Sequence, residues 1–138
     1  PIAFGFHPYL APGGDRRLWE IDLPVAARAE LDERGLPTGR VEGAQPGAHL
    51  LGDAAYDDLF PALEPDPVFV VRTRGIEIEV AFGPGYPCAQ VYAPADADVV
   101  CFEPMTAPTD ALTSGDGLRY AAPGDTFTAA FRIDVTEG

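Results

Sequence analysis

The sequence contains no lysine. All nine of its cations are arginines, and they stand against 22 acidic residues, so the net charge is −13. A field of this sign repels the phosphates of nucleic acids and of anionic lipids. We therefore expect no nucleic-acid partner and no membrane-surface partner, whereas an uncharged small ligand is not penalised. No apolar run approaches the roughly 20 residues that a membrane-spanning helix needs.

Cysteine is also scarce. Cys88 and Cys101 are the only two, and they lack the paired C-x-x-C spacing of a zinc site. Because both lie in apolar stretches, we expect them to act as small buried hydrophobic residues. The sequence has no glycine-rich phosphate loop, no G-x-S-x-G nucleophile motif, no H-E-x-x-H metal motif and no internal repeat. The sequence therefore gives no support for a phosphate-loop protein, a hydrolase with that serine motif, a metalloprotease of that type or a repeat protein.

What the chain does contain indicates one folded domain. Its 138 residues are enough for a single core, and 46% of them are hydrophobic while 22% are charged, which is typical of a globular protein. The first ten residues, PIAFGFHPYL, carry no basic leader and no small-residue cleavage site. A cytoplasmic location is therefore the expectation.

Short apolar stretches separated by glycine- and proline-rich turns predict an all-β chain. The clearest signal is a hairpin of residues 67–72 and 76–82, in which Ile76, Ile78 and Val80 alternate with acids. Residues 25–36 suit a strand better than a single helical turn, residues 36–39 suggest a compact turn, and residues 40–55 suggest a loop with a solvated His49. Further strands are predicted at 17–23, 88–92 and 126–135.

The stretch from Val99 to Leu112 organises the chain. A buried strand, VVCF, meets Glu103 and then Pro104. Proline offers no backbone N–H and restricts the residue before it to extended geometry. We therefore predict that strand pairing stops at Pro104 and that Glu103 is held at the sheet margin as a candidate for proton chemistry. The alternative is an ordinary solvent-facing glutamate.

The N-terminal stretch repeats this pattern. Residues 2–6 suggest a strand in which Gly5 marks a close approach of another backbone or of a ligand, and His7-Pro8 follows at its end. Two proton-transfer groups, His7 and Glu103, are thus predicted at strand ends. The alternative for His7 is a histidine hydrogen-bonded at a surface turn.

These pieces, taken in order, resemble the aldose 1-epimerase (galactose mutarotase) family. The matching motifs are FGFHPYL at 4–10, LPTG at 36–39, YDDLF at 56–60, YPCAQVYAP at 86–94, FEPMTAPTDAL at 102–112 and PGDTFTAAFRIDV at 123–135. No single motif is specific, but their succession over nearly the whole chain is.

The resemblance implies a galactose-mutarotase-like β-sandwich (supersandwich) that binds a free aldohexose such as glucose or galactose. It implies that Glu103 is the general base, that His7 is the general acid, and that Asp57 and Gln90 bind the sugar, whereas Asp58 does not carry the match. No metal, nucleotide or redox cofactor is implied. Tyr9, Phe60 and Tyr92 could face the sugar, although we expect core packing for at least two of them.

The resemblance also implies that residues 1–138 are the C-terminal part of such a domain, because the family has an N-terminal half with further strands and sugar contacts. That half, or a second chain, is expected to complete the fold. Two alternatives stay open. One is a carbohydrate-binding homologue without turnover. The other is a mutarotase for a phosphorylated or sulfonated sugar, for which the candidate arginines are Arg16, Arg17, Arg72 and Arg74.

Overall fold

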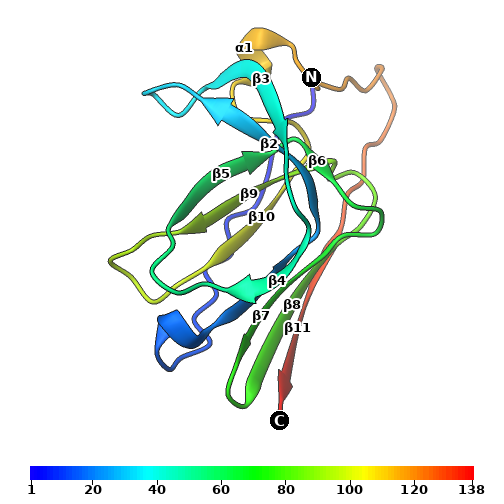
Figure 1. Cartoon of the computed structure of the whole chain (residues 1–138). Coiled ribbons are helices and arrows are strands. Elements are labelled where there is room, and N and C mark those ends of the chain that lie inside the picture. The colour runs from blue at the N-terminus through cyan, green and yellow to red at the C-terminus, as the bar shows by residue number, and fades with distance from the viewer.

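Three antiparallel β-sheets make up most of the structure, a computed structural model that describes residues 1–138 (Figure 1). The largest sheet has the order β11-β8-β7-β1-β4, the second has the order β10-β9-β5 and the third has the order β3-β2-β6. The predicted all-β class is confirmed. The strands are β1 (Glu20–Leu23), β2 (Val25–Leu31), β3 (Pro37–Gly43), β4 (Gly47–Leu50), β5 (Tyr56–Phe60), β6 (Ala62–Leu63), β7 (Val68–Thr73), β8 (Ile76–Phe82), β9 (Cys88–Ala93), β10 (Cys101–Met105) and β11 (Phe131–Glu137).

Helices are confined to single turns, a 3-10 helix at Arg16–Leu18 and α1 at Ala111–Ser114. Neither has the length or the apolar character needed to cross a bilayer.

The hydrophobic core lies between the five-stranded sheet and the β10-β9-β5 sheet. Phe69 of β7 packs on Phe102 of β10 with ring centroids 5.3 Å apart, and on Phe82 of β8 at 4.8 Å. Trp19, Phe69 and Phe102 are the largest fully buried side chains. Each aromatic ring of this size buries enough apolar surface to dominate the packing of the two layers.

Several predicted strands are confirmed, and in β1, β8 and β9 buried residues alternate with more exposed ones. In β1 the buried residues Ile21 and Leu23 alternate with half-exposed acids, as expected for a strand with one face in the core. The predicted hairpin is formed by β7 and β8, with Thr73 opposite Ile76 across the turn. Residues 88–93 form β9, close to the predicted 88–92. The strand predicted at 25–36 is shorter and ends at Leu31, and the strand predicted at 17–23 begins at Glu20, because Arg16–Leu18 form a 3-10 helix.

The predictions of a turn at 36–39 and of a loop over 40–55 are wrong, and Asp57 and Asp58, adjacent acids of a kind common in turns, also lie in a strand. Residues 37–43 form β3, residues 47–50 form β4, and the two acids lie within β5. β3 and β4 are almost entirely exposed, so they show no apolar alternation. β3 is held instead by backbone pairing with β2 and by an ion pair between Arg28 and Glu42, 2.5 Å apart. The predicted final strand begins late, at Phe131.

The prediction that pairing stops at Pro104 is also wrong, and so is the prediction that Glu103 lies at the sheet margin. β10 continues through Pro104 to Met105, paired with Ala89 and Cys88 of β9. The carbonyl of Pro104 accepts a hydrogen bond from Phe6. A residue's N–H and C=O point to the same side of a strand, so the missing donor of Pro104 faces residues 1–10 and not β9.

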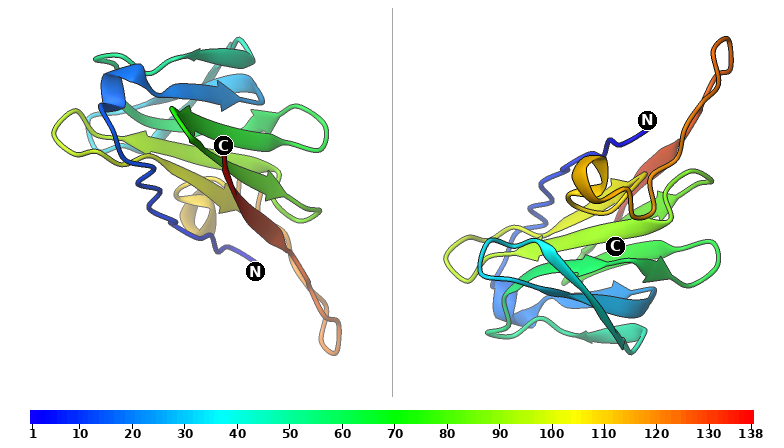
Figure 2. Two further views of the ribbon diagram at one scale, coloured as in Figure 1. Left: turned by 90° about the horizontal axis from the view of Figure 1, so that it is seen from below. Right: turned by 90° about the horizontal axis from the view of Figure 1, so that it is seen from above.

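Residues 1–10 follow β10 in an extended path (Figure 2) but are not a regular strand. Isolated bridges join Gly5 to Met105 and Leu10 to Val100. The close approach predicted at Gly5 is confirmed, because a Cβ there would lie 2.8 Å from the Pro104 oxygen. Pro8 has no N–H to give, so the backbone ladder is open between Phe6 and Leu10.

Candidate functional site

The β10-β9-β5 sheet has one face in the core and polar side chains on the other. Phe102 and Val91 are fully buried in the core, so their strand neighbours Glu103 and Gln90 point to the opposite face. Glu103 and Gln90 are directly opposite each other in the ladder. Asp57 of β5 is opposite Tyr92, two residues along β9 from Gln90. Three of the four predicted site residues therefore share one face of one small sheet.

The fourth predicted residue, His7, is brought to this face by the segment that borders β10. The bridges from Gly5 to Met105 and from Leu10 to Val100 define a single register, in which His7 falls opposite Glu103. The His7 ring is stacked on Tyr9 with centroids 4.6 Å apart, and it meets the edge of Tyr92 at 5.8 Å. These two rings hold the imidazole in one orientation.

His7 and Glu103 are in contact. Nε2 of His7 lies 3.0 Å from Oε1 of Glu103. Although the distance is short, the alignment is not that of a hydrogen bond, and Oε1 is buried without a hydrogen-bond partner. The Glu103 side chain is only 12% exposed, whereas that of His7 is 46% exposed. A buried acceptor without a partner is costly, so the pair is open to a group that can donate to it.

The protein environment changes the acidity of Glu103. Burial, and then the nearby charge of Asp57, raise its pKa from 4.5 to about 7, because both disfavour the ionised carboxylate. A carboxyl group with such a pKa can take up or release a proton near neutral pH, which is the property of an efficient general acid or base.

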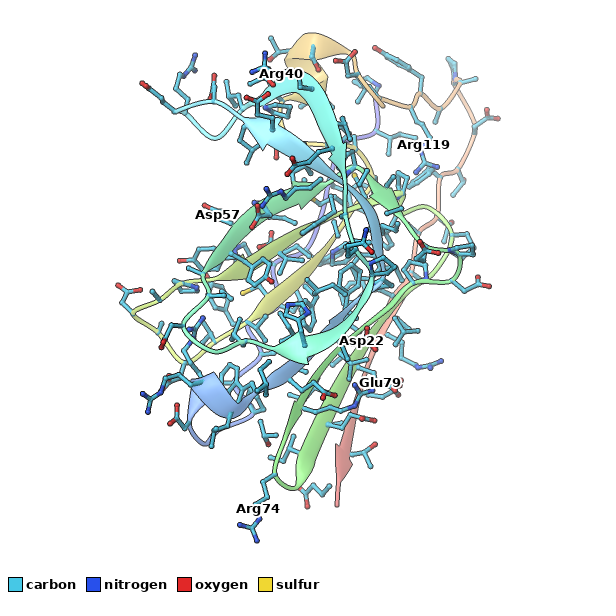
Figure 3. The ribbon with its side chains drawn as sticks, in the orientation of Figure 1. Asp22, Arg40, Asp57, Arg74, Glu79 and Arg119 are labelled. Atoms are coloured by element: carbon cyan, nitrogen blue, oxygen red, sulfur yellow. The ribbon has the colours of Figure 1, made fainter.

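Asp57 and Gln90 form a second pair beside Glu103. The Gln90 amide donates a hydrogen bond of 2.8 Å to Oδ1 of Asp57. Figure 3 shows Asp57 on β5, at the edge of the sheet and near the β2–β3 hairpin that carries Arg40. Asp58 lies on the other face of β5 and pairs with Arg28 at 3.3 Å.

The aromatic residues and Cys101 around the site differ in part from what the sequence predicts. Of the three aromatics, only Phe60 is in the core; Tyr9 is 63% exposed, and Tyr92 is half-buried beside the His7 ring. Cys101 is fully buried, as expected for a small hydrophobic residue. Its Sγ, however, lies within 4.8 Å of a ring nitrogen of His7 and of a carboxylate oxygen of Glu103. Its position two residues before Glu103 on the same strand was the available signal.

Comparison with protein families decides the relationship. The model of the family described as aldose 1-epimerase matches residues 1–134. The chain belongs to the aldose 1-epimerase family. A comparison with curated proteins found no match.

Solved structures of this fold agree with that assignment. The Slr1438 protein of Synechocystis sp. PCC 6803 is 25% identical, with a TM-score of 0.77 over 99% of this chain and 45% of its own. A galactose mutarotase-like protein of Clostridium acetobutylicum is 12% identical, with a TM-score of 0.80 over 100% of this chain and 48% of its own. The second likeness shows the fold: this aldose 1-epimerase family member has a galactose-mutarotase-like β-sandwich. The chain spans about half the length of both relatives.

Proposed function

We propose that this chain carries the proton-transfer residues of an aldose 1-epimerase, which interconverts the α and β anomers of a free aldohexose such as glucose or galactose. The observation that supports the proposal most directly is the contact between His7 Nε2 and Glu103 Oε1 at 3.0 Å. Ring opening moves protons at the anomeric hydroxyl and at the ring oxygen. Both oxygens are bonded to C1, so an acid and a base that act on them must be close neighbours.

In the proposed reaction Glu103 takes the proton of the anomeric hydroxyl while His7 gives a proton to the ring oxygen. The electrons of the O–H bond form the aldehyde C=O, and the bond between C1 and the ring oxygen breaks. Rotation about C1–C2 presents the other face of the aldehyde. The two residues then exchange roles: His7 removes the proton from the former ring oxygen, which attacks C1, and Glu103 protonates the new anomeric oxygen. Each positioned transfer of this kind contributes on the order of 10²–10⁴ in rate.

Asp57 and Gln90 are proposed to bind sugar hydroxyls. They are hydrogen-bonded to each other on the same sheet face as Glu103, and a carboxylate and an amide together supply both acceptors and donors. Since Asp57 also raises the pKa of Glu103, a hydroxyl that donates to Asp57 would couple sugar binding to the basicity of Glu103.

A phosphorylated or sulfonated substrate receives no support from the candidate arginines. Arg17 is paired with Asp15 at 2.8 Å, and Arg72 with Glu20 at 3.2 Å. Arg16 is buried and donates to the backbone carbonyls of Gly52, Ala54 and Ala93. These three cations are already occupied within the fold, and Arg74 lies at the turn of the β7–β8 hairpin, far from Asp57 (Figure 3). An uncharged sugar therefore remains the proposed substrate.

We propose further that the remaining half of the fold, on the same or on another chain, is needed to complete the sugar pocket. The relatives are about twice as long. Along the segment that carries His7, Phe4 and Phe6 are 45% and 49% exposed. An exposed aromatic pair on an incompletely paired segment is a surface that further chain would cover.

Polarimetry of freshly dissolved α-D-glucose and α-D-galactose tests the proposal. We expect the chain, completed by the other half of the domain, to accelerate mutarotation above the buffer rate, and Glu103→Gln to reduce that acceleration by about 10²-fold or more. Asp58→Asn is the matched control and should keep the activity, because Asp58 is next to Asp57 on β5 but lies on the other face of that strand, where it pairs with Arg28.

If a folded sample of this chain does not accelerate mutarotation, residues 1–138 are not sufficient for the activity. Activity that appears only after the other half of the domain is supplied would identify these residues as the catalytic part of a longer site. Sugar binding without turnover in that complete form would instead identify a carbohydrate-binding homologue.

A further inference from the structure

A third metal-ligand atom lies beside the His7–Glu103 pair. The imidazole nitrogen of His7, the thiol sulfur of Cys101 and a carboxylate oxygen of Glu103 all lie within 4.8 Å of one another. Cys101 and Glu103 are two residues apart on β10 and so share a face. His7 reaches them from the bordering segment.

We propose that His7, Cys101 and Glu103 form a binding site for a thiophilic divalent metal such as Zn²⁺, and that metal bound there inhibits the enzyme. Zinc bonds are about 2.3 Å to sulfur and about 2.0–2.2 Å to nitrogen or oxygen, so two ligand atoms of a tetrahedral ion are about 3.3–3.7 Å apart. Nε2 of His7 and Oε1 of Glu103, 3.0 Å apart, are already near this spacing. The sulfur of Cys101, which lies within 4.8 Å of the ligand atoms of both, needs to approach by at most about 1.5 Å.

The ligand set selects the class of metal. Thiolate and imidazole favour Zn²⁺ and Co²⁺, whereas Mg²⁺ and Ca²⁺ prefer sites made entirely of oxygen atoms. Oε1 of Glu103 is buried and has no hydrogen-bond partner, so one acceptor is free for an ion. The net charge of −13 also attracts cations.

Access to the site is from the side of His7, whose side chain is 46% exposed. Cys101 is fully buried and is protonated in the free chain, so the ion displaces the thiol proton, which passes to the buffer. This proton loss is part of the cost of binding. Three protein ligands leave a fourth, open position for water, as in zinc sites that are not purely structural.

The expected consequence is inhibition, since the ion would occupy both atoms that exchange protons with the sugar. This effect on turnover rests on the proposed function, whereas metal binding itself does not. The two parts can therefore be tested separately.

Cobalt absorption tests the binding. We expect Co²⁺ added to the 138-residue chain to give a thiolate-to-cobalt charge-transfer band that saturates at one ion per chain and is displaced by Zn²⁺. Cys101→Ala should abolish the band. Cys88→Ala is the matched control, because Cys88 is also a buried free cysteine of the same sheet but is not part of the cluster, and it should leave the band intact.

Calorimetry with Zn²⁺ provides a second measurement. Loss of a partner that only orients a ligand weakens metal binding by about 10–100-fold, so His7→Gln, which removes a ligand, should cost at least about 10-fold. Circular dichroism verifies that each variant is folded. The absence of a thiolate band from the folded wild-type chain would overturn the proposal, whether or not the Cys101 variant folds, and so would a band that persists in Cys101→Ala.

Inhibition is measured by polarimetry. Zn²⁺ at concentrations that saturate the site should stop the accelerated mutarotation, and a chelator should restore it. Activity that continues with the site saturated would overturn the inhibitory role. If the metal-free chain shows no activity even with the other half of the domain supplied, it is the proposed function that fails, while the cobalt band still decides whether the metal site exists.

Discussion

Glu103 shows how burial and a neighbouring charge together set the chemistry of one residue. Burial is the larger of the two causes that raise its pKa to about 7, and the charge of Asp57 is the smaller. The first disfavours the carboxylate by removing water, and the second does so by repulsion. Only the second can be removed without changing the packing around Glu103.

Asp57→Asn is therefore expected to lower the pKa of Glu103. The loss of a negative charge favours ionisation, but because burial remains, the pKa should stay above its ordinary value of 4.5. The asparagine Oδ1 can still accept the hydrogen bond from Gln90. Titration of the ¹³C-labelled Glu103 carboxyl group by NMR measures the shift. Any activity that requires ionised Glu103 should then extend to lower pH.

Asp58→Asn is the control for this experiment, since Asp58 is next in sequence but does not contribute to the pKa of Glu103. An unchanged Glu103 titration in Asp57→Asn, or an equal shift in both variants, would contradict the assignment of the charge effect to Asp57.

At the scale of the elements, the site depends on how closely residues 1–10 approach β10. Gly5 permits this approach, because a Cβ at that position would lie 2.8 Å from the Pro104 oxygen, which accepts the Phe6 hydrogen bond. A side chain at Gly5 would push the segment outward together with His7, two residues further along.

We expect Gly5→Ala to reduce kcat/KM by about 10²-fold, the cost of displacing a catalytic group by roughly 1 Å, and to destabilise the fold by about 1–3 kcal/mol through overpacking. Gly43→Ala is the control, since no atom lies within 4 Å of its added Cβ. Polarimetry and urea unfolding provide the two measurements. Equal effects of the two substitutions would show that the close approach is not what positions His7.

The elements also show what the sequence could and could not predict. β8 and β9 were predictable because their buried residues alternate, and β7 was predictable because it is a short apolar run that leads through a glycine turn into β8. β3 and β4 were not, because exposed strands stabilised by backbone pairing and ion pairs leave no apolar pattern. Pro104 does not end β10, because the effect of a proline on strand pairing depends on which side of the strand its nitrogen faces.

The candidate site was predictable in its members but not in its geometry. Motifs matching a known family identified His7, Asp57, Gln90 and Glu103. The contact of His7 with Glu103 depends on a register set by two isolated bridges, and no local pattern indicates it. Cys101 was overlooked because a buried cysteine in an apolar run has the same pattern as any small core residue.

At the scale of the whole molecule, the packing of the two main sheets holds the site face in place. Phe102 is fully buried and packs on Phe69 of the opposite sheet, and it directly precedes Glu103. We expect Phe102→Ala to reduce the free energy of unfolding by about 3–5 kcal/mol, the range for large-to-small aromatic changes in a core.

Urea unfolding measures this loss, and Tyr120→Ala is the control. Tyr120 is 71% exposed, so its truncation should change the unfolding free energy by no more than about 0.5 kcal/mol. A small effect of Phe102→Ala would mean that the two sheets do not depend on this contact.

The border between residues 1–10 and β10 has one more consequence. Few hydrogen bonds cross this border, and Pro8 leaves a gap in them where His7 lies. Residues 1–10 can therefore detach from β10 while all three sheets stay intact. Circular dichroism, which measures the content of β-structure, would hardly change, but the imidazole of His7 would no longer contact the carboxylate of Glu103. If the proposed reaction is catalysed, turnover would then report the docking of the first ten residues more sensitively than any spectrum, because the proposed proton transfer requires His7.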